Sequence, residues 1–187
     1  MLDRNAYRSV VGVALATALM LLIPLLAMQI TDEVAWNVFD FVFAGALIFG
    51  TGLTYVLVAR KAGNTAYRFA VGVALAAAFL LVWGNAAVGI TDSGADLMFL
   101  WVPAVGIIGA IIARFQPRGM ARAMFATALA QASVAAIALV FGLGLPWSPP
   151  VEILGLNGFF VALFLGSAWL FRYAAREQPP AGAGQEG

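Results

Sequence analysis

Six long apolar stretches separated by short polar connections set the pattern of this chain. Each approaches the length of about 20 residues that an α-helix needs to cross the hydrocarbon core of a bilayer. The pattern therefore predicts an all-α, polytopic membrane protein with six transmembrane helices in residues 1–176. Residues 177–187 are small and polar, which predicts a disordered cytoplasmic tail. The six stretches lie near residues 8–29, 36–59, 66–90, 97–114, 121–144 and 151–173.

The composition supports the same class. Hydrophobic residues make up 63% of the chain and charged residues only 10%, whereas about a quarter of the residues in soluble domains are charged. Six spans leave no room for a separate soluble domain. The net charge of +1 does not indicate a nucleic-acid partner, because the basic residues are not gathered on one patch.

The positive charges predict the orientation in the membrane. All ten Lys and Arg residues flank alternate ends of the predicted helices, so they would lie on one side. The connections on the other side carry acids instead. Because Lys and Arg concentrate in cytoplasmic loops, both termini are expected in the cytoplasm and the protein in a bacterial inner (plasma) membrane. The four basic clusters are Arg4 and Arg8; Arg60, Lys61 and Arg68; Arg114, Arg118 and Arg122; Arg172 and Arg176.

An internal repeat links the first and third stretches. Residues 6–32 and 66–92 share 15 identities in 27 positions at an offset of 60. Weaker matches extend the relation to the fifth stretch and between the even-numbered stretches. We therefore expect three helical hairpins, at about 6–60, 66–114 and 120–176. Each hairpin would begin and end on the same side, so the repeats would be parallel and related by an axis along the membrane normal.

A few strongly polar side chains lie within the predicted spans, and these are the candidate ligand contacts. An ionisable side chain in the hydrocarbon is costly and is a functional hypothesis by default. If the polar side chains faced inward together, they would line a pocket open to the outer side, with tryptophans in its wall. The alternatives are hydrogen bonds between helices and, for the carboxylate, capping of a helix start. The candidate ligand-binding residues are Asp40, Asn85, Gln131, Asn157, Trp83 and Trp101.

Several chemistries find no support in the sequence. The chain has no cysteine and no histidine, which removes the usual ligands and bases for heme, zinc and Ser-His chemistry. The one lysine, Lys61, lies in a connection, which excludes a Schiff base within the membrane. No phosphate-binding glycine motif occurs in the right context. We therefore expect no enzyme activity, no cofactor and no metal site.

Some motifs resemble a known family. They are Gly63–Arg68 before the third stretch, Arg114–Ala123 before the fifth and Leu156–Phe160 in the sixth. Together they resemble a family of bacterial six-helix inner-membrane proteins with no assigned activity, over nearly the whole chain up to the tail. Members of that family have a longer, Asn-rich acidic loop where this chain has only Thr91–Asp96. The resemblance implies the fold and the location but no reaction.

Two functions follow as hypotheses. The first is a non-enzymatic inner-membrane protein whose polar pocket on the periplasmic side binds or translocates a small molecule or lipid. The second is a structural or accessory subunit, or a self-assembling scaffold, that packs against other membrane proteins or copies of itself. The expected partners are therefore the lipid bilayer, a small-molecule or lipid ligand, and a membrane-protein or homo-oligomeric partner.

Overall fold

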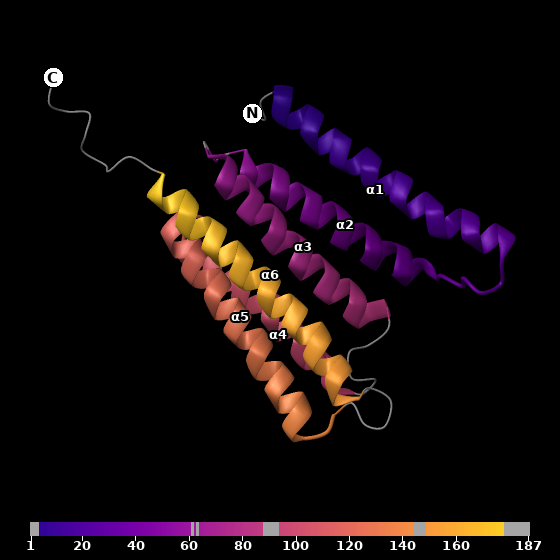
Figure 1. The fold of residues 1–187 in the computed structure, drawn as a ribbon. Coiled ribbons are helices and arrows are strands. Elements are labelled where there is room, and N and C mark those ends of the chain that lie inside the picture. The colour runs from indigo at the N-terminus through magenta and orange to yellow at the C-terminus, as the bar shows by residue number, and fades with distance from the viewer. Residues whose placement is uncertain (1–3, 61, 63, 88–93, 144–148, 178–187) are drawn as a thin grey trace, which may run out of the picture. The chain divides into compact units, whose positions relative to one another are not determined.

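The computed structural model describes residues 4–60, 62, 64–87, 94–143 and 149–177, and their regular structure is entirely helical. Five helices are long and apolar enough to cross a membrane. The elements are α1 (Arg4–Ile30), α2 (Val38–Ala59), α3 (Thr65–Ala87), the 3₁₀ helix η1 (Gly94–Leu100), α4 (Trp101–Ile112), α5 (Pro117–Val140) and α6 (Pro150–Arg176) (Figure 1). The predicted all-α class is thus confirmed, and the five long apolar helices are consistent with a multi-pass membrane protein. The predicted tail at 177–187 lies outside the described residues except for Glu177.

The fourth stretch differs from the predicted span of 97–114. It divides into η1 and a 12-residue α4, and its apolar helical part, Leu97–Ile112, is shorter than the other five candidate spans. Pro103 is the third residue of α4, and a proline without an N–H is tolerated in the first turn of a helix, which favours the start of α4 at Trp101. At the other end, Arg114 and Phe115 turn the chain with φ of 48° and 58°. The left-handed region ends a helix, so α4 stops before Arg114.

Residues Met1–Lys61 form one compact unit, the hairpin of α1 and α2. Two glycines of α2 lie against side chains of α1. A Cβ on Gly52 would come within 2.8 Å of Val13 Cγ1, and one on Gly45 within 3.3 Å of Leu21 Cδ1. The contacts run in opposite directions along the two helices, so the hairpin is antiparallel, with small residues allowing close approach.

Residues Ala62–Gly187 form the second unit, which contains α3 to α6. In it α5 packs along α6, α3 along α6, and α4 along α5 (Figure 1). The predicted pairing of α3 with α4 in one hairpin is not among the extensive helix contacts of the described residues. The core of this unit includes the fully buried side chains of Phe99, Phe164, Phe171, Leu81 and Val102.

The inward face of α5 follows helical periodicity. Its buried residues recur every three or four positions, which places them on one face of the helix. Where α4 crosses this face, Gly109 lies so close that an added Cβ would sit 2.7 Å from Ala123 Cβ. The face includes Met120, Met124, Thr127, Gln131, Ala135 and Ala138.

One end of the second unit is tied together by side chains from all four of its α-helices or their flanking turns. The Tyr67 hydroxyl at the start of α3 donates a hydrogen bond of 2.6 Å to the Phe115 carbonyl oxygen between α4 and α5. The Tyr67 ring packs edge-on against Phe171 of α6, with centroids 5.0 Å apart. Asn64 Nδ2 donates to Glu177 Oε2 after α6. We call this the arginine end, because these contacts gather Arg68, Arg114, Arg118, Arg122, Arg172 and Arg176 there.

Candidate functional site

Two of the predicted polar residues meet in the interior of the second unit. Gln131 of α5 donates through Nε2 to Oδ1 of Asn157 of α6, at 2.5 Å. Asn157 Nδ2 in turn donates to the Ile153 carbonyl oxygen at 2.7 Å. Gln131 is 0% exposed and Asn157 2% exposed, and Gln131 Oε1 has no hydrogen-bond partner among the described residues. This geometry matches the alternative to a ligand pocket, which is a hydrogen bond between two helices.

The other predicted site residues of the second unit are Trp83, Asn85 and Trp101, and they are more exposed than this buried pair. Trp83 and Asn85, near the end of α3, are both partly exposed, and the Trp83 ring stacks on Phe79 with centroids 5.7 Å apart. Trp101 opens α4 and is 71% exposed. A side chain so exposed faces the surroundings of the bundle, as an aromatic anchor in a membrane interface does.

Asp40 belongs to the other unit and caps its own helix. Its Oδ2 accepts the backbone N–H of Asn37 at 2.8 Å, while Asn37 Oδ1 accepts the N–H groups of Phe39 and Asp40 at 2.7 and 3.3 Å. This reciprocal pair is a capping box, which satisfies free N–H groups of the first turn. The structure therefore gives Asp40 the helix-capping contact that the sequence leaves open as an alternative.

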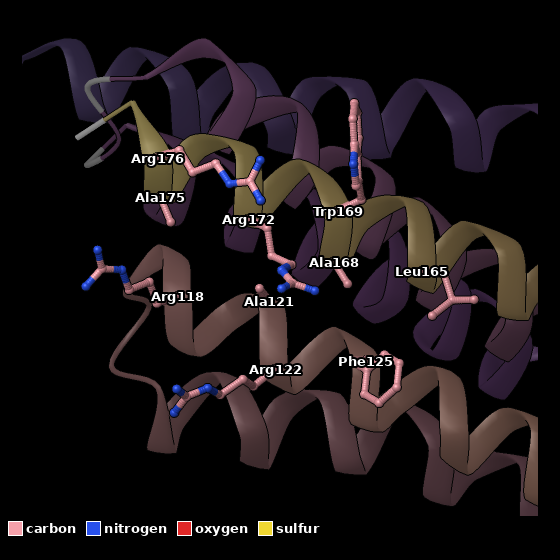
Figure 2. Close-up of a pocket in the computed structure, with 10 residues that line it drawn as sticks. All are labelled: Arg118, Ala121, Arg122, Phe125, Leu165, Ala168, Trp169, Arg172, Ala175 and Arg176. Carbon is pink, nitrogen blue, oxygen red and sulfur yellow. The ribbon is translucent and has the colours of Figure 1, made fainter.

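A groove between α5 and α6 is the site that the sequence analysis missed. It has a volume of about 660 Å³ and lies within the second unit (Figure 2). Both helices contribute charged and apolar side chains to it. Its lining is Arg118, Ala121, Arg122 and Phe125 from α5, and Leu165, Ala168, Trp169, Arg172, Ala175 and Arg176 from α6.

Small side chains form the floor of this groove and large ones its rim. Ala121, Ala168 and Ala175 are buried. Because alanine fills so little space, the two helices leave a hollow above these positions. Phe125 and Trp169 are exposed beside it, as large apolar side chains. The groove thus combines a closed floor with an apolar rim.

The groove is charged at one end and apolar at the other. Figure 2 shows the arginines at the end where α6 finishes, with Phe125 and Leu165 farther along the helices. The guanidinium of Arg172 reaches from α6 toward α5. This polarity is typical of a site for an amphiphile, whose headgroup and hydrocarbon chains need different surroundings.

The four arginines raise the positive potential of this site without an acid to balance it. None of the ten lining residues is acidic. Glu177, next in sequence to Arg176, accepts a hydrogen bond from Asn64. Like charges four residues apart on a helix repel each other, and both arginine pairs have this spacing. A bound anion would relieve the repulsion.

The lining chemistry suits the binding of an anion. Guanidinium groups form paired hydrogen bonds with phosphate and carboxylate oxygens. The ten lining residues offer no hydroxyl, carboxylate, thiol, imidazole or amine that could act as nucleophile or general base. An anion could be held here, but the lining supplies no group to transform it.

One sequence signal could have located the groove. In α5 the order is Arg118, Arg122, Phe125, and in α6 it is Trp169, Arg172, Arg176, with the same spacings reversed. When two such segments lie in antiparallel helices, arginines of one helix lie level with arginines of the other, and the aromatic residues also lie level with each other. The hairpin expected at 120–176 pairs these two helices, but the sequence does not give the depth at which their arginines meet.

Comparison with known proteins adds no further constraint, since no protein-family model, curated protein or solved structure matches this chain. The groove and the buried amide pair are therefore the features of the described residues that bear on function.

Proposed function

We propose that this chain is a non-enzymatic protein of a bacterial inner membrane that binds an amphiphile with an anionic headgroup in the groove between α5 and α6. The observation that carries the proposal is the gathering of four guanidinium groups at one end of a groove with no acidic lining residue. Basic pockets between transmembrane helices are a recurring way to hold anionic lipid headgroups. The apolar rim formed by Phe125, Leu165 and Trp169 would contact the hydrocarbon chains.

The proposed orientation puts the arginine end in the cytoplasm, together with both termini. The positive-inside distribution of Lys and Arg supports it. The headgroup would then be drawn from the cytoplasmic leaflet, where anionic lipids concentrate. We also propose that a duplicated hairpin is the origin of the similar sequences of α1 and α3, even though α3 packs mainly against α6 in the folded chain.

Binding is favoured over translocation by the interior of the second unit. Farther along α5 and α6 from the arginines, Gln131 and Asn157 are buried and bonded to each other. A path for a polar headgroup between these helices would have to break that bond and open the packed interface. We therefore place the ligand in the groove alone and not in a pocket on the periplasmic side.

Lipid binding to the purified full chain tests the proposal. Native mass spectrometry would compare bound phosphatidylglycerol with bound phosphatidylcholine for the natural protein and the variant Arg122→Gln/Arg172→Gln. The natural protein should retain the anionic lipid preferentially, and the double variant should lose that preference. Arg68→Gln removes an exposed charge at the same end but outside the groove, so it should behave as the natural protein does.

Two results would contradict the proposal. One is equal retention of the two lipids by the natural protein. The other is a loss in Arg68→Gln as large as in the groove variant, which would indicate general surface attraction. A chain that retains no lipid selectively and purifies as an oligomer would favour the scaffold hypothesis.

The orientation can be tested separately because the natural chain has no cysteine. Single cysteines at Thr65, which begins α3, and at Val151, near the start of α6, mark opposite ends of the second unit. A membrane-impermeant thiol reagent added to intact cells should label the cysteine at 151 only. Labelling at 65 from outside would reverse the proposed orientation.

A further inference from the structure

The groove carries its positive charge as two separate pairs, one on each helix. Arg118 and Arg122 are four residues apart on α5, and Arg172 and Arg176 are four apart on α6. Residues with this spacing lie on the same face about one helical turn, ~5.4 Å, apart. Each helix therefore contributes two arginines to the lining of the groove. Figure 2 shows Arg172 reaching toward α5, while the guanidinium groups of Arg118 and Arg122 point away from α6 and that of Arg176 lies along α6.

A single phosphodiester carries one negative charge, whereas the two pairs together carry four positive charges. Two phosphodiesters would offset one charge in each pair. Figure 2 shows the guanidinium groups of Arg118 and Arg122 pointing away from those of Arg172 and Arg176, so one phosphate group would not meet both pairs. The repulsion within the pair left without a phosphate would persist. Two linked phosphates, by contrast, could place one group at each pair. The arrangement therefore matches a headgroup with two anionic centres held apart by a short linker.

The lipid chemistry follows from the rest of the groove. Phe125, Leu165 and Trp169 extend the lining away from the charges with apolar side chains that are exposed to the surroundings. A soluble anion would use only the arginine end and leave this apolar part unoccupied. A lipid would use both, with its chains along the rim and its headgroup between the guanidinium pairs.

We propose that the groove selects a lipid of the diphosphatidylglycerol type, with two phosphodiesters joined by a glycerol bridge, one phosphate meeting the α5 pair and the other the α6 pair. This inference rests on the proposed function, since it names the headgroup that the same site prefers. A charge-assisted hydrogen bond contributes enough to change affinity by at least about tenfold. The second phosphate should therefore give diphosphatidylglycerol about tenfold tighter binding than phosphatidylglycerol at equal phosphate concentration.

The experiment titrates the full chain with each lipid in detergent and follows binding by native mass spectrometry. Phosphatidylglycerol is used at twice the concentration of diphosphatidylglycerol, so that the phosphate is matched, and phosphatidylcholine gives the baseline. Two variants remove one pair each, Arg118→Gln/Arg122→Gln and Arg172→Gln/Arg176→Gln. Each should bind the two anionic lipids equally, and Arg68→Gln should keep the tenfold preference.

The outcomes separate this inference from the proposed function. Equal affinity of the natural protein for the two anionic lipids, both above phosphatidylcholine, would overturn the inference and leave the proposed function standing. Affinity no higher than that for phosphatidylcholine would overturn both. Displacement of diphosphatidylglycerol by millimolar inorganic pyrophosphate would identify a soluble diphosphate as the ligand and overturn the lipid assignment. Retention of bound lipid in excess pyrophosphate would support it.

The four arginines are exposed, so their replacement by glutamine should leave the fold intact. Circular dichroism and thermal unfolding of each variant check this. If a paired variant fails to fold, the single variants Arg118→Gln and Arg176→Gln provide the same test with one charge removed from each helix. Each single variant should show a preference between that of the natural protein and none, and an unchanged preference in both would overturn the inference.

Discussion

The carboxamide nitrogen of Gln131 lies 2.5 Å from the carboxamide oxygen of Asn157, joining the middle of α5 to α6 in a bond that is closed to the surroundings. Polar side chains inside a helical membrane protein are either functional contacts or bonds between helices, and the composition of a span does not distinguish them. The direct bond and the complete burial of Gln131 favour a contribution to packing.

Replacing one partner of this pair should cost more than replacing both. In Asn157→Leu, Gln131 loses its acceptor and is left buried with unmet hydrogen bonds, which should lower the free energy of unfolding by about 1–2 kcal/mol. The double variant Gln131→Leu/Asn157→Leu removes both polar groups, so its cost should be smaller than the sum of the single costs. The stability of the natural protein, the two single variants and the double variant is measured by thermal unfolding in one detergent. If the two single costs add up to the cost of the double variant, a direct interaction is contradicted.

Chemical accessibility gives a second test of the same pair. Cysteines placed at 131 and 157 should resist a membrane-impermeant thiol reagent from either side, because both positions are buried. A cysteine at Trp169, on the exposed rim of the groove, should react with a membrane-permeant maleimide. Labelling of 131 by the impermeant reagent would restore the hypothesis of a water-filled pocket.

Close packing of α4 on α5 predicts a costly substitution at Gly109. An added methyl would sit 2.7 Å from Ala123 Cβ and 3.2 Å from its Cα, so the two backbones must move apart. Overpacking of this kind costs about 1–3 kcal/mol. The control is Gly84→Ala in α3, where no described atom outside the adjoining backbone of that helix lies within 4 Å of the new Cβ. Gly109→Ala should unfold at a lower temperature than the natural protein, and Gly84→Ala should not.

Loss of the capping box should destabilise the start of α2. Asp40→Ala removes the acceptor for the Asn37 N–H but leaves the Asn37 side chain as the N-cap, so it should cost less than the loss of the N-cap itself, which is about 1 kcal/mol. Hydrogen exchange of the amides from Val38 to Phe41 should become faster, whereas selectivity for anionic lipid should remain. Glu33→Gln changes an exposed acid outside α2 and should alter neither property. A loss of lipid selectivity in Asp40→Ala, with unchanged exchange, would favour a ligand contact over capping.

Repulsion among the groove arginines should be measurable without ligand. In lipid-free neutral detergent at low salt, Arg122→Gln should raise the stability of the protein by about 0.2–0.5 kcal/mol, because it removes one like-charge pair on α5. The gain should fade as salt screens the charges. Unfolding temperatures over a salt series measure it, and a stability loss in Arg122→Gln at all salt concentrations would show that this arginine stabilises the fold without an anion.

Hydropathy predicted most of the elements because it is a local property. The apolar stretches near 8–29, 36–59, 121–144 and 151–173 correspond to α1, α2, α5 and α6 within a few residues, since a helix that crosses a membrane must be apolar over most of its length. The prediction of one continuous helix over 97–114 was wrong. Pro103 was visible in the sequence, but the division into η1 and α4 also depends on the turn at Arg114 and Phe115.

The sequence by itself predicted the membrane class and most of the helices, and it gives the identity of the polar and charged residues. Tertiary structure decided which of them meet. Gln131 and Asn157 are 26 positions apart, and Tyr67 and Phe115 are 48 apart, so no local period can predict either contact. The groove also depends on tertiary structure. Its two arginine pairs line one site only because α5 and α6 pack antiparallel, with Arg122 and Arg172 at the same level along the two helices. The packing of the small buried residues beneath them sets that level.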